Sequence, residues 1–290
     1  MKNYSISLDL YLRRDHSFST SKQYLYHINR FLKNNPNASE MEYVDIVNDI
    51  IEDRHKRGGV VNIETKLAAL KRYYDYLIET GVRNDHPCKT LKLKFKKAEI
   101  QIQDLFSNEE LSLLLTSTTK NWSNAIRHKL IISFLIYQGL TSHEVTKIKI
   151  KDIDLEEGKI LIKPNRKTNG RVLNLKPNQI GWIHSYLEKV RNNFTNAEDG
   201  LLLLNTKGMF YTPSAIFDII ENLKPLFPDR ILNPTTIRQS FIANLLNQDK
   251  IAVEHVQLIV GHQWPMTTTR YQSIDLDEKI KQVQSWHPLG

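Results

Sequence analysis

The stretch IRHKLIISFLIYQGLTSHEVTKIKIKDIDLEEGKILIKPNRKTNGRVLNL, residues 126–175, predicts a buried helix followed by a small sheet. Residues 126–137 are apolar on nearly every face, which is typical of a helix at the centre of a domain. Gly139 ends this helix, and Thr141 with Glu144 resembles the capping box of a short one. Apolar and polar residues alternate in three later segments, 149–154, 159–163 and 171–175. Because Asn169-Gly170 is typical of a two-residue turn, the last two segments are expected to form an antiparallel hairpin.

Helical patterns surround this stretch on both sides. In the same domain Ser107 and Glu110 form a capping box, and Thr235 is expected to cap a helix that runs to Asn247. Further helices of this domain are expected at 177–191, from 213, and at 253–260, 267–273 and 277–286. Four amphipathic helices are expected in the first third, at 4–14, from Thr20, from Ser39, and at 62–81. The fold class is therefore mainly α, with an N-terminal helical bundle and a mainly helical second domain that contains a small three-stranded antiparallel sheet.

Charge is concentrated where the two domains are expected to meet. We assign residues 1–88 to the bundle, 89–103 to a basic linker and 104–290 to the second domain. Residues 1–97 hold 18 Lys and Arg against 12 Asp and Glu, so most of the net charge of +8 lies there. The linker segment KTLKLKFKK contains no acid, and its lysines could lie along the phosphates of a nucleic acid; the four candidates are Lys92, Lys94, Lys96 and Lys97. The alternative is a solvated linker.

Composition excludes several classes of protein. No apolar run approaches the roughly 18 residues of a membrane span, and the opening residues lack the order of a signal peptide, so no membrane association and a cytoplasmic location are expected. The single Cys88 excludes a disulfide scaffold and a Cys-rich zinc site. No P-loop, no Gly-rich dinucleotide turn and no HExxH pair is present. We therefore expect no ATP, no NAD, no metal and no other cofactor.

The last third holds residue types that suit phosphate chemistry. Arg238 lies on a predicted helix, Gly261-His262 ends the next one, and Tyr271 follows nine residues after His262. Each is unremarkable alone: a helix arginine is usually on the surface, a Gly-His pair usually ends a helix, and a tyrosine is usually packing. Their order, together with Lys167 before the Asn-Gly turn and the basic first third, forms a pattern.

This pattern resembles the tyrosine recombinase family of phage integrases and Xer recombinases, and the resemblance covers nearly the whole chain. KQYLYHINRFL and KLAALKRYYDYLIETGVRNDHPCKTL resemble the core-binding bundle of that family. FLIYQGLTSHEVTKIKIKDIDLEEGKILI resembles the stretch that carries Gly-Leu-Arg-x-Ser-Glu in the family. NPTTIRQSFIANLL resembles the His-x-x-Arg helix, and IVGHQWPMTTTRYQSI resembles the Leu-Gly-His element with its nucleophilic tyrosine.

The resemblance implies a site-specific recombinase that cuts and rejoins DNA without metal or ATP. Tyr271 would attack a backbone phosphate and form a 3′-phosphotyrosyl bond, Arg238 would bind the phosphate, and His262 would donate a hydrogen bond to it. Lys167 would protonate the departing 5′-oxygen, although the neighbouring Arg166 leaves the register open. The resemblance also implies that the partner is double-stranded DNA and that the protein acts as a homo-tetramer on two duplexes. The last helix, 277–286, would pack either on a neighbouring protomer or on its own domain.

Two positions depart from the family pattern. Thr141 stands where the first arginine is expected, and Thr235 stands three residues before Arg238 in place of a histidine. Loss of one charge-stabilising donor typically costs about 10² to 10³ in rate. Three basic side chains could refill the site, and the sequence does not choose among them: Arg127, Arg166 and Arg171. The departures favour one alternative, a catalytically impaired relative that only binds or bends DNA. A helical protein without a nucleic-acid role is the other.

Overall fold

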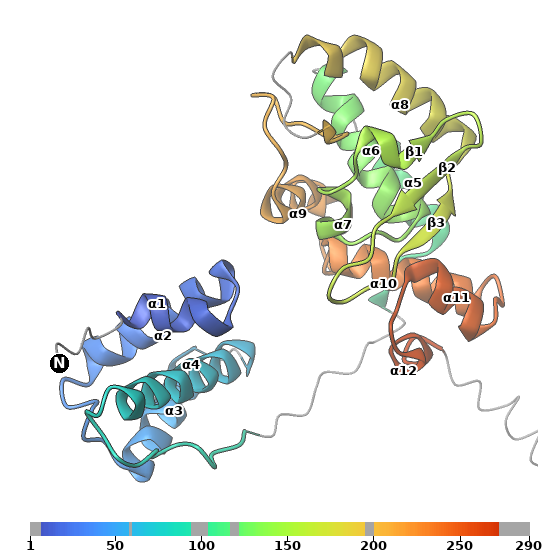
Figure 1. Cartoon of the computed structure of the whole chain (residues 1–290). Helices are drawn as coiled ribbons and strands as arrows, with labels where there is room; N and C mark the ends of the chain where they lie inside the picture. The colour runs from blue at the N-terminus through green and yellow to red at the C-terminus, as the bar shows by residue number, and fades with distance from the viewer. Residues whose placement is uncertain (1–6, 58–59, 94–103, 117–121, 195–199, 273–290) are drawn as a thin grey trace, which may run out of the picture. The chain divides into compact units, whose positions relative to one another are not determined.

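The computed structural model describes residues 7–57, 60–93, 104–116, 122–194 and 200–272 (Figure 1). The chain divides into two compact units, Met1–Ala98 and Glu99–Gly290. The prediction of a mainly helical chain with a small three-stranded antiparallel sheet is confirmed. No helix among the described residues is both long and apolar enough to cross a membrane. The predicted last helix, 277–286, and three of the linker lysines, Lys94, Lys96 and Lys97, lie outside the described residues.

The first unit is a helical bundle. Its elements are α1 (Leu8–Asp15), α2 (Phe18–Asn34), α3 (Tyr43–Arg57) and α4 (Val60–Glu79). Helix α4 packs against α1, α2 and α3, around a core that includes Phe31, Leu70 and Tyr74. Leu91 is buried against the same core, so the chain stays packed on the bundle into the predicted linker. Lys92 is exposed beside it.

The helix starts in the bundle differ from the prediction, and the end of α4 agrees with it. Ser7 caps α1, which begins at Leu8 and not at residue 4, and α4 begins at Val60, two residues before the predicted start. The side chain of Ser17 accepts a hydrogen bond from the Thr20 backbone and caps α2, so Thr20 is the third residue of the helix and not its cap. Helix α3 begins at Tyr43, four residues after Ser39. Gly81 has φ of +73° and ends α4 as predicted.

The second unit is built around the buried helix α6 (Trp122–Tyr137). Around it lie α5 (Asn108–Thr116), α8 (Pro177–Lys189), α9 (Pro213–Glu221) and α10 (Pro234–Asn247), all of which contact it. The shorter elements are α7 (Ser142–Val145), the 3₁₀ turns η2 (Ile150–Asp152), η3 (Arg191–Asn193) and η5 (Lys224–Leu226), and the last described helices α11 (Val253–Val260) and α12 (Pro265–Thr269). Leu130, Ile131 and Phe134 of α6 are fully buried, as the all-round apolar pattern predicts.

The sheet has the predicted order but shorter strands. Strands β1 (Ile153–Asp154), β2 (Lys159–Ile162) and β3 (Arg171–Asn174) pair in that order, antiparallel throughout. The predicted first strand began at Lys149, but residues 150–152 form η2 instead. The carboxylate of Asp152 accepts a hydrogen bond from the Lys149 backbone at 3.1 Å, which favours the turn.

The prediction of a two-residue turn at Asn169-Gly170 is wrong. Ile162 pairs with Arg171, so residues 163–170 form one longer loop between β2 and β3. The Asn169 backbone N–H donates to the Gly261 carbonyl at 2.8 Å, and Thr168 forms a β-bridge with His262. These contacts with the end of α11 take the place of a tight turn. We call residues 163–170 the β2–β3 loop.

Helix caps place the residues that surround the site. The boxes Ser107–Glu110 and Thr141–Glu144 form as predicted. The cap of α10 is Asn233 and not Thr235: its side-chain oxygen accepts from the backbones of Thr235 and Thr236 at 2.9 Å each. Thr235 is therefore an exposed residue in the first turn of α10.

Candidate active site

The C-terminal end of α11 is the point on which the candidate residues converge. Gly261 ends the helix with φ of +72°, a conformation that favours glycine. A Cβ at this position would lie 2.7 Å from Nη1 of Arg171 and 2.9 Å from the carbonyl oxygen of Asn169. The glycine therefore serves two purposes: it turns the chain toward His262, and it lets the β2–β3 loop and Arg171 lie against the helix end.

Arg238 reaches this point from α10. One of its terminal nitrogens, Nη1, donates to the carbonyl of Gly139, and the other, Nη2, donates to the carbonyl of Val260 at 2.7 Å. The side chain is largely buried, and burial lowers its pKa to about 10. Arg238 is therefore still a cation at neutral pH, held between the end of α6 and the end of α11.

A second buried guanidinium, that of Arg171, reaches the same helix end from β3. Its Nε donates to the carbonyl of Ile259 at 2.7 Å, and its Nη1 donates to Oε1 of Glu144 at 2.7 Å. The two side chains of this ion pair are 5 % and 2 % exposed, so solvent screens it little. Burial alone would raise the pKa of Glu144, but the hydrogen bond and charge of Arg171 outweigh burial and hold the pKa at about 2.

Glu144 connects three parts of the chain. Its Oε2 accepts hydrogen bonds from the backbone and hydroxyl of Thr141 at 2.8 and 3.0 Å. Its Oε1 accepts from Arg171 and from the hydroxyl of Thr168 at 2.8 Å. The carboxylate thus fixes α7, the β2–β3 loop and β3 relative to one another.

His262 follows Gly261 and is 8 % exposed. Its Nδ1 lies 2.9 Å from the hydroxyl oxygen of Thr268 in α12. Burial, and then the charges of Arg238 and Arg171, lower its pKa to about 4. The imidazole is therefore neutral at pH 7 and carries one N–H, which leaves it a hydrogen-bond donor that adds no charge.

Tyr271 is half-buried directly after α12. Its ring centroid lies 6.5 Å from that of His262, with the rings 23° from parallel. Its carbonyl accepts a hydrogen bond from the side chain of Asn247 at 2.9 Å, which ties it to the end of α10. The phenolate form of Tyr271 would raise the pKa of Arg238, because the two side chains are neighbours. The structure thus brings Arg238, His262 and Tyr271 together at one place.

Lys167 lies on the exposed outer part of the β2–β3 loop. The side chain of Asn165 accepts from the backbones of Lys167 and Thr168 at 2.8 and 3.1 Å and so shapes the loop. The inner part of the loop is held at the site, where Thr168 donates to Glu144 and bridges to His262. Lys167 is therefore attached to the site through its neighbour, while its own side chain reaches solvent.

Comparisons with known proteins identify the family of this chain. The family model described as the phage integrase family matches residues 104–277. The chain belongs to this family. Family proteins similar to it include the tyrosine recombinase XerC of Staphylococcus haemolyticus (strain JCSC1435), 24 % identical over 96 % of this chain and 94 % of that protein. The tyrosine recombinase XerD of Yersinia pestis is 25 % identical over 86 % of this chain and 82 % of that protein. The predicted resemblance to tyrosine recombinases is confirmed.

The fold agrees with solved structures of the family. The crystal structure of the XerH site-specific recombinase bound to its difH substrate, a pre-cleavage complex, superposes with a TM-score of 0.73. The match covers 98 % of this chain and 86 % of that chain at 20 % sequence identity. At this identity the match shows the fold, and the arrangement of the site residues comes from the contacts above.

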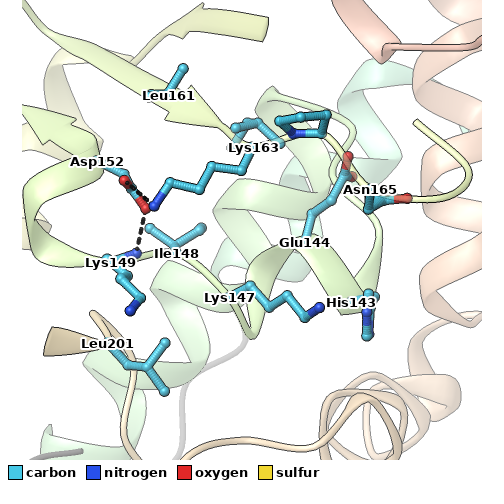
Figure 2. Close-up of a pocket in the computed structure, with 12 residues that line it drawn as sticks. His143, Glu144, Lys147, Ile148, Lys149, Asp152, Leu161, Lys163, Asn165 and Leu201 are labelled. Atoms are coloured by element: carbon cyan, nitrogen blue, oxygen red, sulfur yellow. Dashed lines mark hydrogen bonds and ion pairs between the residues drawn. The ribbon is translucent and has the colours of Figure 1, made fainter. Parts of the chain in front are cut away.

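A pocket of about 300 Å³ adjoins the site through Glu144. Its lining includes the apolar side chains of Ile148 and Leu201 and the lysines Lys147, Lys149 and Lys163 (Figure 2). Figure 2 shows Lys163 reaching across to Asp152, with which it forms an ion pair at 3.1 Å. This integrase-family domain therefore has a basic surface next to the buried charges.

Two features of the site have no local signal in the sequence. The bond from Arg238 to Gly139 joins residues 99 positions apart, and the bond from Arg171 to Ile259 joins residues 88 positions apart. The pairing of Glu144 with Arg171 also crosses elements, although the capping role of Glu144 was predictable.

Among the described residues, no group of three or more His, Cys, Asp and Glu side chains could hold a metal ion.

Proposed function

We propose that this protein is a site-specific DNA recombinase that cuts and rejoins DNA through a 3′-phosphotyrosyl intermediate. The observation that carries the proposal is the convergence of Tyr271, His262 and the guanidinium of Arg238 on the C-terminal end of α11. Family membership supports it, because the relatives are named as tyrosine recombinases. The alternative of a relative that only binds DNA is not favoured by these names.

The first step exchanges one phosphoester for another. The phenolic oxygen of Tyr271 attacks the phosphorus, the new O–P bond forms, and the bond from phosphorus to the 5′-oxygen breaks. The phenolic proton passes to solvent water at the half-buried Tyr271, and the ammonium group of Lys167 gives a proton to the departing 5′-oxygen, so the number of protons is balanced. A 5′-hydroxyl of another strand then reverses the step, so bond energy is kept and no nucleotide cofactor is consumed.

The buried groups stabilise charge on the phosphate. Arg238 neutralises negative charge that grows on the non-bridging oxygens. The role requires the tautomer of neutral His262 that carries its N–H on Nε2: in that tautomer Nδ1 accepts from the Thr268 hydroxyl, and Nε2 donates to a phosphate oxygen. Carbonyls of Gly139 and Val260 hold Arg238 in place before DNA binds, so no reorganisation is needed.

The partner is double-stranded DNA. Four copies of the protein bind two paired DNA sites as a homo-tetramer, and the reaction takes place in the cytoplasm. Lys92, Lys94, Lys96 and Lys97 contact backbone phosphates and contribute a salt-dependent part of the affinity. Within the second unit, Lys147 and Lys149 line the pocket and are further candidates for phosphate contacts.

The test is covalent trapping. Fragmented genomic DNA of the source organism is incubated with wild type or with Tyr271→Phe, and SDS-resistant complexes are separated on a denaturing gel. Wild type is expected to form an adduct, and the phenylalanine variant is expected to bind DNA with nearly the same affinity and form none. Equal adduct yields would remove Tyr271 from its role, and binding without any adduct in either protein would contradict the proposed activity.

A further inference from the structure

The site contains one more buried cation than the proposed roles use. Three basic residues were candidates to replace the arginine that is absent at Thr141. Arg127 donates to the carbonyl of Ser123 and the side chain of Asn124 and packs over the Phe194 ring, so its partners lie outside the site. Arg166 is exposed in the β2–β3 loop. Arg171 is the candidate that the structure places at the site.

Arg171 and Arg238 bind neighbouring carbonyls at the end of the same helix. Arg171 binds the carbonyl of Ile259, and Arg238 binds the next carbonyl, that of Val260. Both carbonyls lie in the last turn of α11, where the helix dipole favours cations. The charge of Arg171 lowers the pKa of both Arg238 and His262, as expected for groups that share one site.

One nitrogen of Arg171 has no hydrogen-bond partner in the described part of the chain. Nε and Nη1 are bound to Ile259, Glu144 and Asn169, but Nη2 is buried and makes no hydrogen bond with any described residue. A guanidinium has five N–H donors in a rigid planar fork, so fixing Nε and Nη1 also fixes Nη2. A buried donor left unpaired is unfavourable, and native proteins rarely keep one without a purpose.

We propose that Arg171 supplies the second guanidinium of the phosphate site: its Nη2, which protein atoms cover in this structure, donates to a non-bridging oxygen of the phosphodiester when bound DNA displaces that cover. This inference rests on the proposed function. Arg171 then acts in place of an arginine at position 141, where Thr141 is engaged in capping α7. Glu144 orients Arg171 and cancels part of its charge, so the phosphate meets a site that is cationic but not overcrowded with like charges.

The first test compares DNA cleavage by wild type, Arg171→Gln and Arg127→Gln. Arg127 is the matched control because it is also a buried arginine with an unpaired nitrogen, in this case Nε. Substrates carry either the normal phosphodiester or a neutral methylphosphonate at the cleavage position found by adduct trapping. Arg171→Gln is expected to slow cleavage of the phosphodiester by about 10² to 10³-fold. On the methylphosphonate, which has no oxyanion charge to neutralise, the loss is expected to be less than about tenfold.

A second measurement does not depend on cleavage. Inorganic phosphate presents the same oxygens, and it is expected to raise the melting temperature of wild type and of Arg127→Gln by more than that of Arg171→Gln, which keeps Arg238 and His262 but lacks one of the two guanidinium groups. If Arg171→Gln does not fold, Arg171→Lys replaces it in both experiments, because lysine keeps the positive charge but lacks the planar guanidinium. This variant should retain part of the cleavage rate and part of the phosphate-induced rise in melting temperature. Equal losses on both DNA substrates, or an unchanged phosphate effect in Arg171→Gln, would overturn the proposal. A wild type that responds to phosphate through Arg171 yet forms no DNA adduct would instead contradict the proposed function alone.

Discussion

Replacement of Glu144 by glutamine should destabilise the second unit by an amount that depends on pH. Glu144 forms the buried ion pair with Arg171 and accepts from both donors of Thr141. The variant leaves Arg171 without its counter-charge, and the new amide N–H₂ cannot accept the bonds that an oxygen accepted. Breaking one side of a buried pair typically costs about 3 to 5 kcal/mol.

The pKa of Glu144 gives a second measure of the same effect. The pKa is lowered from 4.5 to about 2, and each tenfold change in proton affinity is worth about 1.4 kcal/mol. Ionised Glu144 therefore stabilises the folded protein by about 3 kcal/mol at neutral pH. Because the folded pKa is depressed, this stability is fully present above pH 4.5 and is lost as the pH falls toward 2.

Urea unfolding followed by tryptophan fluorescence measures the free energy of unfolding of the second unit, since all four tryptophans lie in that unit, beyond residue 98. Glu144→Gln is expected to lower the free energy of unfolding by about 3 kcal/mol at pH 7, with the difference from wild type shrinking between pH 4.5 and 2. Glu157→Gln is the control: its ion pair with Lys159 is exposed, so we expect less than about 1 kcal/mol. A difference below 1 kcal/mol for Glu144→Gln, or one that stays constant to pH 2.5, would refute the reasoning.

Two further substitutions test the geometry around α11 and α7. Gly261→Ala should destabilise the protein by more than about 1 kcal/mol and slow cleavage, because the added Cβ would displace Arg171 and the residue has φ of +72°. Thermal unfolding measures the loss of stability, and the adduct assay measures cleavage. A normal adduct yield would contradict the prediction. From the sequence alone, Thr141→Arg should raise cleavage. The structure changes that expectation: the substitution removes the α7 cap, typically worth about 0.5 to 2 kcal/mol, and brings a guanidinium to a carboxylate that Arg171 already holds. We expect Thr141→Arg to leave the adduct yield of wild type unchanged and to raise that of Arg171→Gln. The measurement compares adduct yields of wild type, Thr141→Arg, Arg171→Gln and the double variant. A higher yield for Thr141→Arg than for wild type would count against the role of Arg171.

Much of the fold was predictable because its signals are local. The all-round apolar pattern of α6 and the capping boxes Ser107–Glu110 and Thr141–Glu144 depend on residues within one or a few turns. The helix starts at Thr20 and Thr235 were predicted wrongly for an equally local reason, since Ser17 and Asn233 lie close upstream and cap better.

The turn at Asn169-Gly170 failed for a different reason. Its backbone bonds to Gly261, which is 92 positions later in the chain, and this long-range contact overrides the local turn preference. The site shows the same division. Arg238, His262 and Tyr271 stand out by their order and spacing, but Arg127, Arg166 and Arg171 are equivalent in the sequence. Only the burial of Arg171 against Glu144 and Ile259 distinguishes it.

The central claim is that Tyr271 forms a covalent bond to the 3′ side of a DNA phosphate. The most direct measurement is mass spectrometry of the trapped complex after digestion with nuclease and protease, which locates the nucleotide on the polypeptide and identifies the end of DNA that it carries. The account predicts a nucleotide joined through its 3′-phosphate to the peptide that contains Tyr271, with a free 5′-hydroxyl on the other DNA end. A nucleotide attached to any other residue, or a linkage through the 5′-phosphate, would contradict it.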